Sequence, residues 1–262
     1  MNKLACITGA SSGIGETFAR ELARRGYDLL ITARREERLV ALKHALEAAH
    51  GITVSYCRAD LTTEDGIRTV EDALCGAAAV DMLINNAGFG LGGLFSEIET
   101  HKLVDMLVMH NIVPVRLTKA VVPAMKKRGS GTIINVASTA GFIPVPGSAT
   151  YPATKAFLVS FSRALEKELR HYGIRVQALC PGFTYTGFHD TPAFANFKRT
   201  DLPGIMWMRA DRVVRGSLAA AEKGRVVYIP GIVNKLLVAC IDNPLFGPFI
   251  WHEMLKKKGL KT

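Results

Sequence analysis

The stretch Thr8-Gly-Ala-Ser-Ser-Gly-Ile-Gly15 decides the fold of this chain. It follows an apolar run at residues 4–8 and precedes an amphipathic run at residues 13–25. Glycines here let the backbone turn tightly from a strand into a helix and let a ligand approach the main chain closely. The helix N-terminus then offers unpaired amides and a positive dipole end, which bind phosphate groups. The sequence therefore predicts a strand, a phosphate-binding turn and a helix.

The same alternation of short apolar runs and longer amphipathic runs continues along the chain. The runs predicted to be strands are residues 4–8, 28–33, 53–58, 82–85, 131–136, 175–179 and 225–228. The main predicted helices are 13–25, 36–49, 103–127 and 153–172. Strands separated by helices form βαβ units with a parallel sheet. We therefore expect an α/β fold: one Rossmann-type domain over residues 1–262, doubly wound, with about seven parallel strands and helices on both faces.

The composition is that of a folded globular chain and not of a disordered one, with 48% hydrophobic and 21% charged residues. The net charge is +10, but the basic residues lie in short, scattered clusters at 34–35, 126–128 and 256–258. No aromatic residues interleave with these clusters, and no nucleic-acid-binding motif accompanies them. We therefore expect a small-molecule ligand and no nucleic-acid partner.

Neither a signal peptide nor a membrane-spanning helix is expected. The first predicted strand begins almost at Met1, without a charged leader before an apolar stretch. The strongest membrane candidate, residues 229–251, is interrupted by Lys235, Asp242, Pro244 and Pro248. The chain has five cysteines: Cys6, Cys57, Cys75, Cys180 and Cys240. Their spacing fits neither disulfides nor a metal site, so we expect reduced thiols packed in the core of a cytoplasmic protein and no bound metal.

Tyr151 and Lys155 lie four residues apart in a predicted helix, so both side chains lie on one face. A cation at that distance favours the phenolate, and we expect it to bring the pKa of Tyr151 closer to neutrality. Such a tyrosine can donate and accept a proton. The alternative is a solvated helix face, and only further polar groups aimed at the same place favour the catalytic interpretation.

The end of the second predicted strand bears on the choice of nucleotide. A carboxylate at this point binds the adenosine 2′-hydroxyl of NAD, but here Ala33 is followed by Arg34 and Arg35. A guanidinium at Arg34 can instead pair with the 2′-phosphate of NADP. We therefore expect NADP(H), with NAD(H) less favoured. The alternative is that Arg34 only begins a solvent-facing helix.

Taken together, these motifs resemble the short-chain dehydrogenase/reductase family over nearly the whole chain. The residues that carry the resemblance are Thr8–Gly15, Asp60, Asn85–Gly88, Asn111, Ser138, Tyr151, Lys155 and Pro181-Gly182. The resemblance implies that Tyr151 exchanges a proton with the substrate oxygen and that Ser138 hydrogen-bonds that oxygen. It also implies that Lys155 holds the nicotinamide ribose and that Asn111 anchors a water for proton relay.

The resemblance also implies a cofactor-binding set that extends along most of the chain. Its members are Gly9, Ser11, Ser12, Gly13, Ile14, Gly15, Arg34, Asp60, Leu61, Asn86, Ala87, Gly88, Asn111, Tyr151, Lys155, Pro181, Gly182, Thr184 and Thr186. Two residues depart from the family pattern. Thr184 replaces an apolar residue, and Ser12 replaces a basic residue common in NADP-selective members, so 2′-phosphate binding is expected to rest mainly on Arg34.

We expect an enzyme that interconverts a carbonyl and a secondary alcohol on a small, apolar substrate. Segment 183–208 follows directly on the Pro181-Gly182 motif, which favours a substrate lid over a merely packed loop. Its Phe, Met and Trp residues favour an apolar substrate. The apolar C-terminal extension, residues 230–262, could cover the cleft, touch a membrane surface or pack against another subunit. The family implies a homodimer or homotetramer. The alternatives are a catalytically silent NADP(H)-binding sensor or scaffold, and an epimerase or dehydratase of the same fold.

Overall fold

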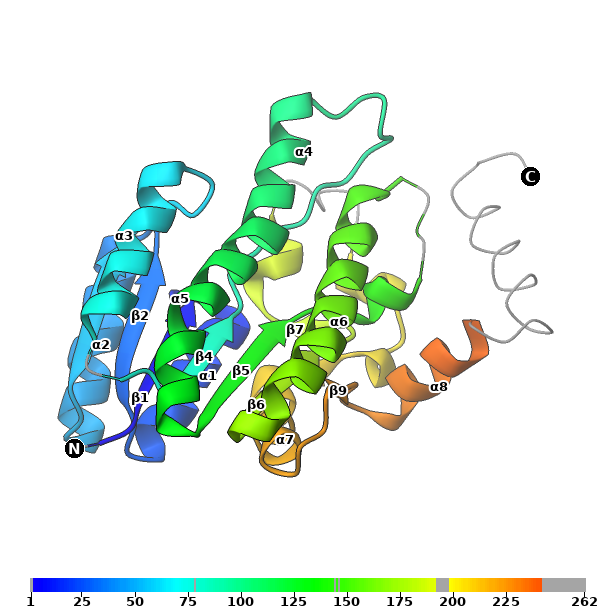
Figure 1. The fold of residues 1–262 in the computed structure, drawn as a ribbon. Coiled ribbons are helices and arrows are strands. Elements are labelled where there is room, and N and C mark those ends of the chain that lie inside the picture. Colours follow the sequence, from blue (N-terminus) through cyan, green and yellow to red (C-terminus); the bar gives the residue numbers. More distant parts are fainter. Residues whose placement is uncertain (1, 78, 144, 146, 192–197, 242–262) are drawn as a thin grey trace.

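The computed structural model describes residues 2–77, 79–143, 145, 147–191 and 198–241. A seven-stranded parallel sheet forms its centre, with the strand order β3-β2-β1-β4-β5-β6-β9 (Figure 1). The strands are β1 (Leu4–Thr8), β2 (Asp28–Ala33), β3 (Val54–Arg58), β4 (Met82–Asn85), β5 (Gly131–Val136), β6 (Ile174–Leu179) and β9 (Val227–Tyr228). The predicted doubly wound α/β fold is confirmed, and each predicted strand boundary lies within two residues of the observed one.

Helices cover both faces of the sheet. They are α1 (Gly13–Arg24), α2 (Glu36–His50), α3 (Glu64–Gly76), α4 (Thr100–Leu107), α5 (Val113–Arg128), α6 (Thr150–Leu169), α7 (Ala210–Glu222) and α8 (Ile232–Ile241). One hydrophobic core lies between the sheet and helices α1, α2 and α7, and a second lies between the sheet and α3, α5 and α6. Figure 1 shows α3, α5 and α6 side by side across one face.

The pleat of the strands divides the apolar side chains between these two cores. Ile7 and Ile31 belong to the core under α1 and α2, whereas their neighbours Cys6 and Leu30 belong to the opposite core. Successive strand residues point to opposite faces, so a strand covered on both sides must be apolar at every position. Fully burying each such side chain stabilises the fold by roughly 1.5–3 kcal/mol.

The segment predicted as one helix over residues 103–127 begins earlier and contains a wide turn. Helix α4 begins at Thr100, and a π-helical turn, Val108–Ile112, joins it to α5. A π-turn bonds residue i to i+5 and changes the direction in which the side chains point. Periodicity in the sequence gave no sign of this turn, which contains Asn111.

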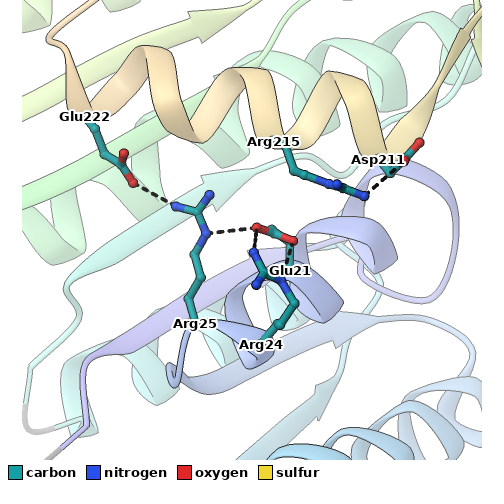
Figure 2. Close-up of polar contacts among 6 residues, drawn as sticks. All are labelled: Glu21, Arg24, Arg25, Asp211, Arg215 and Glu222. Atoms are coloured by element: carbon teal, nitrogen blue, oxygen red, sulfur yellow. Dashed lines mark hydrogen bonds and ion pairs between the residues drawn. The ribbon is translucent and has the colours of Figure 1, made fainter.

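Ion pairs connect α1 to α7 on the face opposite α5 (Figure 2). Arg25 donates to Glu21 and, at 2.7 Å, to Glu222 of α7, while Arg24 pairs with Glu21 at 2.8 Å. Asp211 accepts from Arg215 at 3.1 Å, and its pKa lies below its ordinary value because of hydrogen bonding to Arg209. We call this set the α1–α7 ion-pair cluster: Glu21, Arg24, Arg25, Asp211, Arg215 and Glu222.

Within the described ranges, no helix has both the length and the apolar character needed to span a membrane. The membrane candidate at 229–251 and the C-terminal extension extend beyond α8 into residues 242–262, which lie outside the described part. All five cysteines are free thiols, of which Cys6 and Cys180 are buried. The expectation that all of them pack in a core is wrong for Cys75 and Cys240, which are exposed.

Candidate active site

The candidate site lies at the carboxyl ends of the central strands, where the strand order reverses. Strand β1 pairs with β2 on one side and with β4 on the other. The loops that leave β1 and β4 therefore diverge to opposite faces and open a crevice between them, which is where doubly wound sheets bind ligands. The stretch Thr8–Gly15 occupies this position and connects β1 to α1.

The phosphate loop is tied to the loop that follows β4. Asn86 donates its side-chain amide to the carbonyl of Thr8 at 2.8 Å, and the Thr8 hydroxyl accepts from the backbone amides of Asn86 and Ala87, both at 2.9 Å. Gly9 has φ +69°, and a Cβ there would lie 2.9 Å from the Cα of Ala87. Only glycine permits this close crossing, so two predicted cofactor segments are fixed against each other.

The start of α1 has the features of an anion site. The N-cap residue Ser12 makes no side-chain capping hydrogen bond, and Gly13 and Gly15 form the first turn. Amides at such a terminus are donors for phosphate oxygens. Of the other predicted cofactor residues in this part, Leu61 is buried in the core under α3, α5 and α6, and Ile14 packs against the opposite core under α1, α2 and α7, so their side chains serve packing. These residues fit a dinucleotide pyrophosphate.

Two arginines follow β2, and they behave differently. Arg34 is exposed, with its guanidinium 4.0 Å from the carboxylate of Asp60. Arg35 reaches back and donates to the hydroxyls of Ser11 at 2.9 Å and Ser12 at 3.0 Å. The sequence prediction assigned the phosphate contact to Arg34 and missed Arg35. Successive residues that leave a strand point to opposite sides, so one of the pair must turn toward the phosphate loop.

The surroundings of Arg35 concentrate positive charge beside the phosphate loop. Burial lowers the pKa of the Arg35 guanidinium below its ordinary value, and the cations of Arg38 and Arg34 lower it further. Cations that lie close enough to lower one another's pKa also create a positive potential around them, and this potential attracts an anion. Ser12 stands where a basic residue was expected, and the hydrogen bond from Arg35 brings a guanidinium to that same point.

Tyr151 and Lys155 lie in the first turns of α6, close to Ser138 at the end of β5. The Lys155 ammonium is buried and donates to the carbonyl of Val136 at 3.0 Å. It lies 5.5 Å from the centre of the Tyr151 ring. Ser138 hydrogen-bonds the Tyr151 side chain and also bonds the carbonyl of Pro181 at 3.4 Å. Strand β5 and helix α6 thus bring the three predicted catalytic side chains together.

Burial dominates the titration of both α6 residues. It raises the pKa of Tyr151 to about 12, and the hydrogen bond with Ser138 offsets only part of this rise. Burial lowers the pKa of Lys155 to about 8. The expectation that Lys155 brings the Tyr151 pKa toward neutrality is therefore not met in this arrangement. Burial thus shifts both groups toward their neutral forms, although Lys155 with a pKa of about 8 still carries its proton at pH 7, and such shifts are typical of functional sites.

Asn111 lies in the π-turn and faces α6. Its side-chain amide donates to the carbonyl of Thr154 at 3.2 Å, and no contact in the described structure joins it directly to Lys155. His110, which precedes it, also faces α6 and bonds the hydroxyl of Thr154 at 2.9 Å. Neither His110 nor Thr154 was predicted from the sequence. Consecutive residues on one helix face are not expected from an α-helical period, and the π-turn is what brings both of them inward.

The segment after β6 closes one side of the site. Thr184 is buried and donates to the carbonyl of Gly182 at 3.0 Å. Thr186 packs against Gly13 of the phosphate loop. Phe188 lies over the Tyr151 ring, with the ring centres 6.0 Å apart. The predicted lid therefore begins directly above the candidate site.

A small two-stranded parallel sheet, missed by the sequence analysis, fixes the base of this segment. Strand β7 (Thr184–Tyr185) pairs with β8 (Met208–Arg209), and Trp207 lies between the rings of Phe183 and Tyr185. The first turn of α8 supports it, because the buried Asn234 packs against Gly182 and donates to the carbonyl of Pro230 at 2.8 Å. The predicted lid residues Phe194 and Phe197 lie outside the described residues.

A small apolar pocket adjoins Tyr151. Its lining comes from the loop after β4 and from α4, with Tyr151 and the start of α6 completing it. The apolar residues are Leu91, Phe95, Ile98, Leu103 and Met106. Apolar contacts with the substrate were predicted for segment 183–208 and, as one alternative, for residues 230–262, but not for this loop or α4. The signal it passed over was the run of apolar side chains in the glycine-rich loop at residues 88–98.

Comparison with known proteins identifies the family of this chain. Residues 3–193 match the family model of the short chain dehydrogenases. The chain belongs to this family. A short-chain dehydrogenase from Sphingobium yanoikuyae in complex with NADPH is 37% identical, with a TM-score of 0.82 over 88% of each chain. The bulky-bulky ketone specific alcohol dehydrogenase from Comamonas testosteroni is 33% identical, with a TM-score of 0.78 over 90% of this chain and 91% of that one.

Among curated proteins, this short-chain dehydrogenase is similar to very-long-chain 3-oxoacyl-CoA reductase-B of Danio rerio. The two are 34% identical over 190 residues, which are 71% of this chain and 61% of that one. The match with reductase-A of the same organism spans 59% of the relative. The chain thus spans about three fifths of the length of these curated relatives.

Proposed function

We propose that the protein is an NADP(H)-dependent oxidoreductase that interconverts a carbonyl and a secondary alcohol on a small, apolar substrate. The observation that carries the proposal is the meeting of Tyr151, Ser138 and Lys155 at the carboxyl edge of the sheet, beside a phosphate-binding helix start. The matched relatives are named as reductases and alcohol dehydrogenases, which supports this reaction class.

The chain's own residues transfer one proton and hydrogen-bond the substrate oxygen. The nicotinamide, when bound, supplies the hydride chemistry. In reduction, negative charge develops on the substrate oxygen, and the hydroxyls of Tyr151 and Ser138 donate hydrogen bonds that strengthen with that charge. Tyr151 passes its proton to the oxygen. The ammonium of Lys155 stabilises the remaining phenolate, and in oxidation the proton moves the opposite way.

The predicted cofactor residues keep the roles implied by the resemblance. Gly9 to Gly15 would hold the pyrophosphate, and Asp60 with Leu61 would lie beside the adenine. Asn86 to Gly88 would lie along the dinucleotide, while Pro181, Gly182, Thr184 and Thr186 would lie at the nicotinamide. Support comes from the fixed crossing of the phosphate loop and the loop after β4, and from the packing of Thr186 on Gly13.

We infer that both Arg34 and Arg35 bind the 2′-phosphate of NADP(H). Arg35 brings a guanidinium to Ser11 and Ser12, and Arg34 stands exposed beside Asp60 with room to turn toward an anion. The NADPH complex of the Sphingobium relative supports the same choice. Selectivity for NADP(H) over NAD(H) would then depend on Arg35 as well as on Arg34, at which it was predicted from the sequence.

The apolar pocket beside Tyr151 supports an apolar substrate. Leu91, Phe95 and Ile98 line one side, with Leu103 and Met106 from α4 on the other, and Phe188 of the lid covers the Tyr151 ring. Few polar groups face this space, so hydrophobic burial would provide most of the binding. The apolar character of these walls favours a ketone or acyl-chain carbonyl with an apolar substituent over a polar one.

A coupled activity screen tests the reaction class. Purified protein is mixed with NADPH or NADP and with ketones, acyl-chain carbonyls or secondary alcohols, and the absorbance of the reduced nicotinamide is followed. We expect turnover with apolar ketones and a rate about a thousandfold lower with the Tyr151→Phe variant. Tight NADPH binding without turnover of any compound would overturn the proposal and favour a cofactor-binding sensor.

A binding titration tests the cofactor choice. We expect the wild-type protein to bind NADPH more tightly than NADH, and both Arg34→Ala and Arg35→Ala to weaken NADPH binding by about tenfold, the loss of one charge-assisted hydrogen bond. NADH binding serves as the control, because it lacks the 2′-phosphate and should stay within about twofold. Equal affinity of the wild type for the two cofactors would contradict the assignment.

A homodimer or homotetramer and a cytoplasmic location remain predictions. Exposed apolar side chains lie along α4, the π-turn and α5, namely Val104, Leu107, Ile112 and Val115. A continuous apolar stripe of this kind is typical of a subunit contact. Sedimentation of the wild type beside Leu107→Asp tests this, since a charge in such a contact should release monomers.

A further inference from the structure

We propose that His110 is a positioning residue that ties the loop after β4 to helix α6 through the hydroxyl of Thr154. The inference rests on the proposed function, which assigns cofactor binding to that loop and proton transfer to Tyr151 of α6. His110 is buried, with 1% of its surface exposed, and touches both segments. Both ring nitrogens are engaged by protein groups, at Phe89 and Thr154, so His110 would act through the groups that it holds.

The contacts run unbroken from one segment to the other. The backbone amide of Phe89 donates to Nε2 of His110 at 3.1 Å. The other ring nitrogen, Nδ1, lies 2.9 Å from Oγ1 of Thr154. The Thr154 hydroxyl donates to the carbonyl of Tyr151 at 2.7 Å. Three hydrogen bonds therefore connect the Gly88-Phe89 loop to the backbone of the catalytic tyrosine.

The direction of each bond fixes where the protons lie. The amide of Phe89 can only donate, so Nε2 must carry a lone pair and the ring proton must lie on Nδ1. Nδ1–H then donates to Thr154, whose own proton is given to Tyr151. Every donor in this series of three hydrogen bonds has an acceptor. Reversing the direction of any one bond would leave a buried group unpaired. The bridge is a single, rigid arrangement.

A charged ring does not fit this place. A second ring proton would point at the Phe89 amide, and burial lowers the pKa of His110 well below 6.5, with a further contribution from the Lys155 cation. His110 is thus held as neutral imidazole close to the site. Its function here needs two directional hydrogen bonds and not a charge, which distinguishes it from a proton carrier.

Packing holds the ring as tightly as the hydrogen bonds do. A Cβ at Gly88 would lie 2.8 Å from Nε2, so the glycine of the Asn85–Gly88 motif makes room for this ring. The ring of Phe89 lies on one side, with centres 5.8 Å apart, and the Tyr151 ring meets it edge-on at 5.7 Å and 76°. The Tyr151 ring therefore contacts both His110 and Phe188, and we expect a shift of His110 to displace the reacting hydroxyl.

Two substitutions separate the two ends of the bridge. His110→Gln places an amide oxygen near the position of Nε2 and keeps an acceptor for Phe89, but it removes the donor to the hydroxyl oxygen of Thr154. His110→Asn places an amide group near the position of Nδ1 and keeps a donor for Thr154, but it leaves the Phe89 amide unpaired. We expect His110→Gln to lower kcat by about tenfold with NADPH affinity within about twofold.

The second variant should affect NADPH affinity more than kcat. His110→Asn is expected to weaken NADPH binding by about tenfold, while kcat at saturating NADPH falls less than in His110→Gln. Thr154→Val should behave like His110→Gln, and Thr154→Ser, which keeps the hydroxyl, should restore kcat. A role in stability alone would lower the denaturation temperature of both His110 variants without separating kcat from NADPH affinity.

The outcomes distinguish this inference from the proposed function. A wild type that binds NADPH but turns over no carbonyl defeats the proposed function. A wild type that turns over, with His110 variants that lose kcat and affinity in parallel or keep both, defeats the bridge. The ¹⁵N spectrum of the imidazole gives a readout that needs no activity: we expect a neutral ring protonated at Nδ1, and a proton on Nε2 would overturn the assignment.

Discussion

Two polar clusters lie on opposite faces of the same sheet. The charges in one are paired with opposite charges, whereas the other holds a buried charge without such a partner in the described part of the chain. In the α1–α7 ion-pair cluster the acids have cations beside them, so the pKa of Glu21 is lowered, mainly by its hydrogen bond from Arg24 (Figure 2). In the candidate site, Lys155 is buried beside the carbonyl of Val136, and none of the described residues gives it a carboxylate partner. Its pKa falls to about 8.

This difference indicates that the α1–α7 ion-pair cluster serves stability and that the candidate site serves function. Opposite charges that pair near the surface keep their charged forms and support the packing of α1 on α7. A buried ammonium without a counter-charge destabilises the folded state, and proteins retain such groups where chemistry requires them. Substitutions in the two clusters should therefore change stability in opposite directions.

The largest expected effect on stability comes from Lys155→Met. Lowering the pKa from 10.5 to about 8 corresponds to about 3 kcal/mol of destabilisation at neutral pH. The lost hydrogen bond to Val136 offsets about 1 kcal/mol of the gain. We expect the variant to be inactive and more stable by about 2 kcal/mol, measured by urea denaturation at pH 7.

The pH dependence of this gain follows from the sign of the shift. The unfolded chain holds the Lys155 proton up to its ordinary pKa of 10.5, whereas the folded protein releases it near 8. The destabilisation is therefore complete below pH 8 and declines as the pH rises toward 10.5. A variant that is less stable than the wild type at pH 7, or a gain that does not shrink by pH 9.5, would break the comparison.

A smaller effect of opposite sign is expected from Glu21→Gln. Glu21 accepts from both Arg24 and Arg25, and the amide keeps the shape but removes the charge. We expect a loss of about 1 kcal/mol in the free energy of unfolding at neutral pH, with kcat/KM unchanged. Because the folded pKa lies below 4.5, the deficit should diminish as the pH falls through that pKa. A deficit independent of pH would show that charge is not its source.

The smallest effect is expected from Arg215→Ala. Its guanidinium is largely exposed and pairs with Asp211 within one helix, where solvent and salt screen the attraction. The denaturation midpoint should stay within experimental error of the wild type at high salt and fall slightly at low salt. A large loss at both salt concentrations would place this pair among the residues that hold the fold.

Most of the fold could be predicted from the sequence because its signals are local. A buried parallel strand such as residues 28–33 is apolar along its length, and the glycines after Thr8 allow few backbone paths. Spacing within one helix also placed Tyr151 and Lys155 on one face. The order of the strands then brought Ser138 to them.

The missed features depend on contacts between distant segments. Whether Arg34 or Arg35 turns toward Ser12 depends on the backbone conformation at the end of β2. Both arginines lie 22 or more positions from that serine in the sequence. The π-turn that faces both His110 and Asn111 toward Thr154 leaves no mark in the periodicity. The pKa of Tyr151 depends on its depth in the protein, and the sequence shows the neighbouring cation but not the burial.

The central claim is that Tyr151 transfers the proton at this site, and single-turnover kinetics test it most directly. Wild type and Tyr151→Phe are saturated with NADPH, mixed with the best ketone from the screen, and followed by the loss of nicotinamide absorbance. We expect the variant to bind NADPH as the wild type does and to react about a thousandfold more slowly, as removal of a general acid requires. A rate within about tenfold of the wild type would contradict the account.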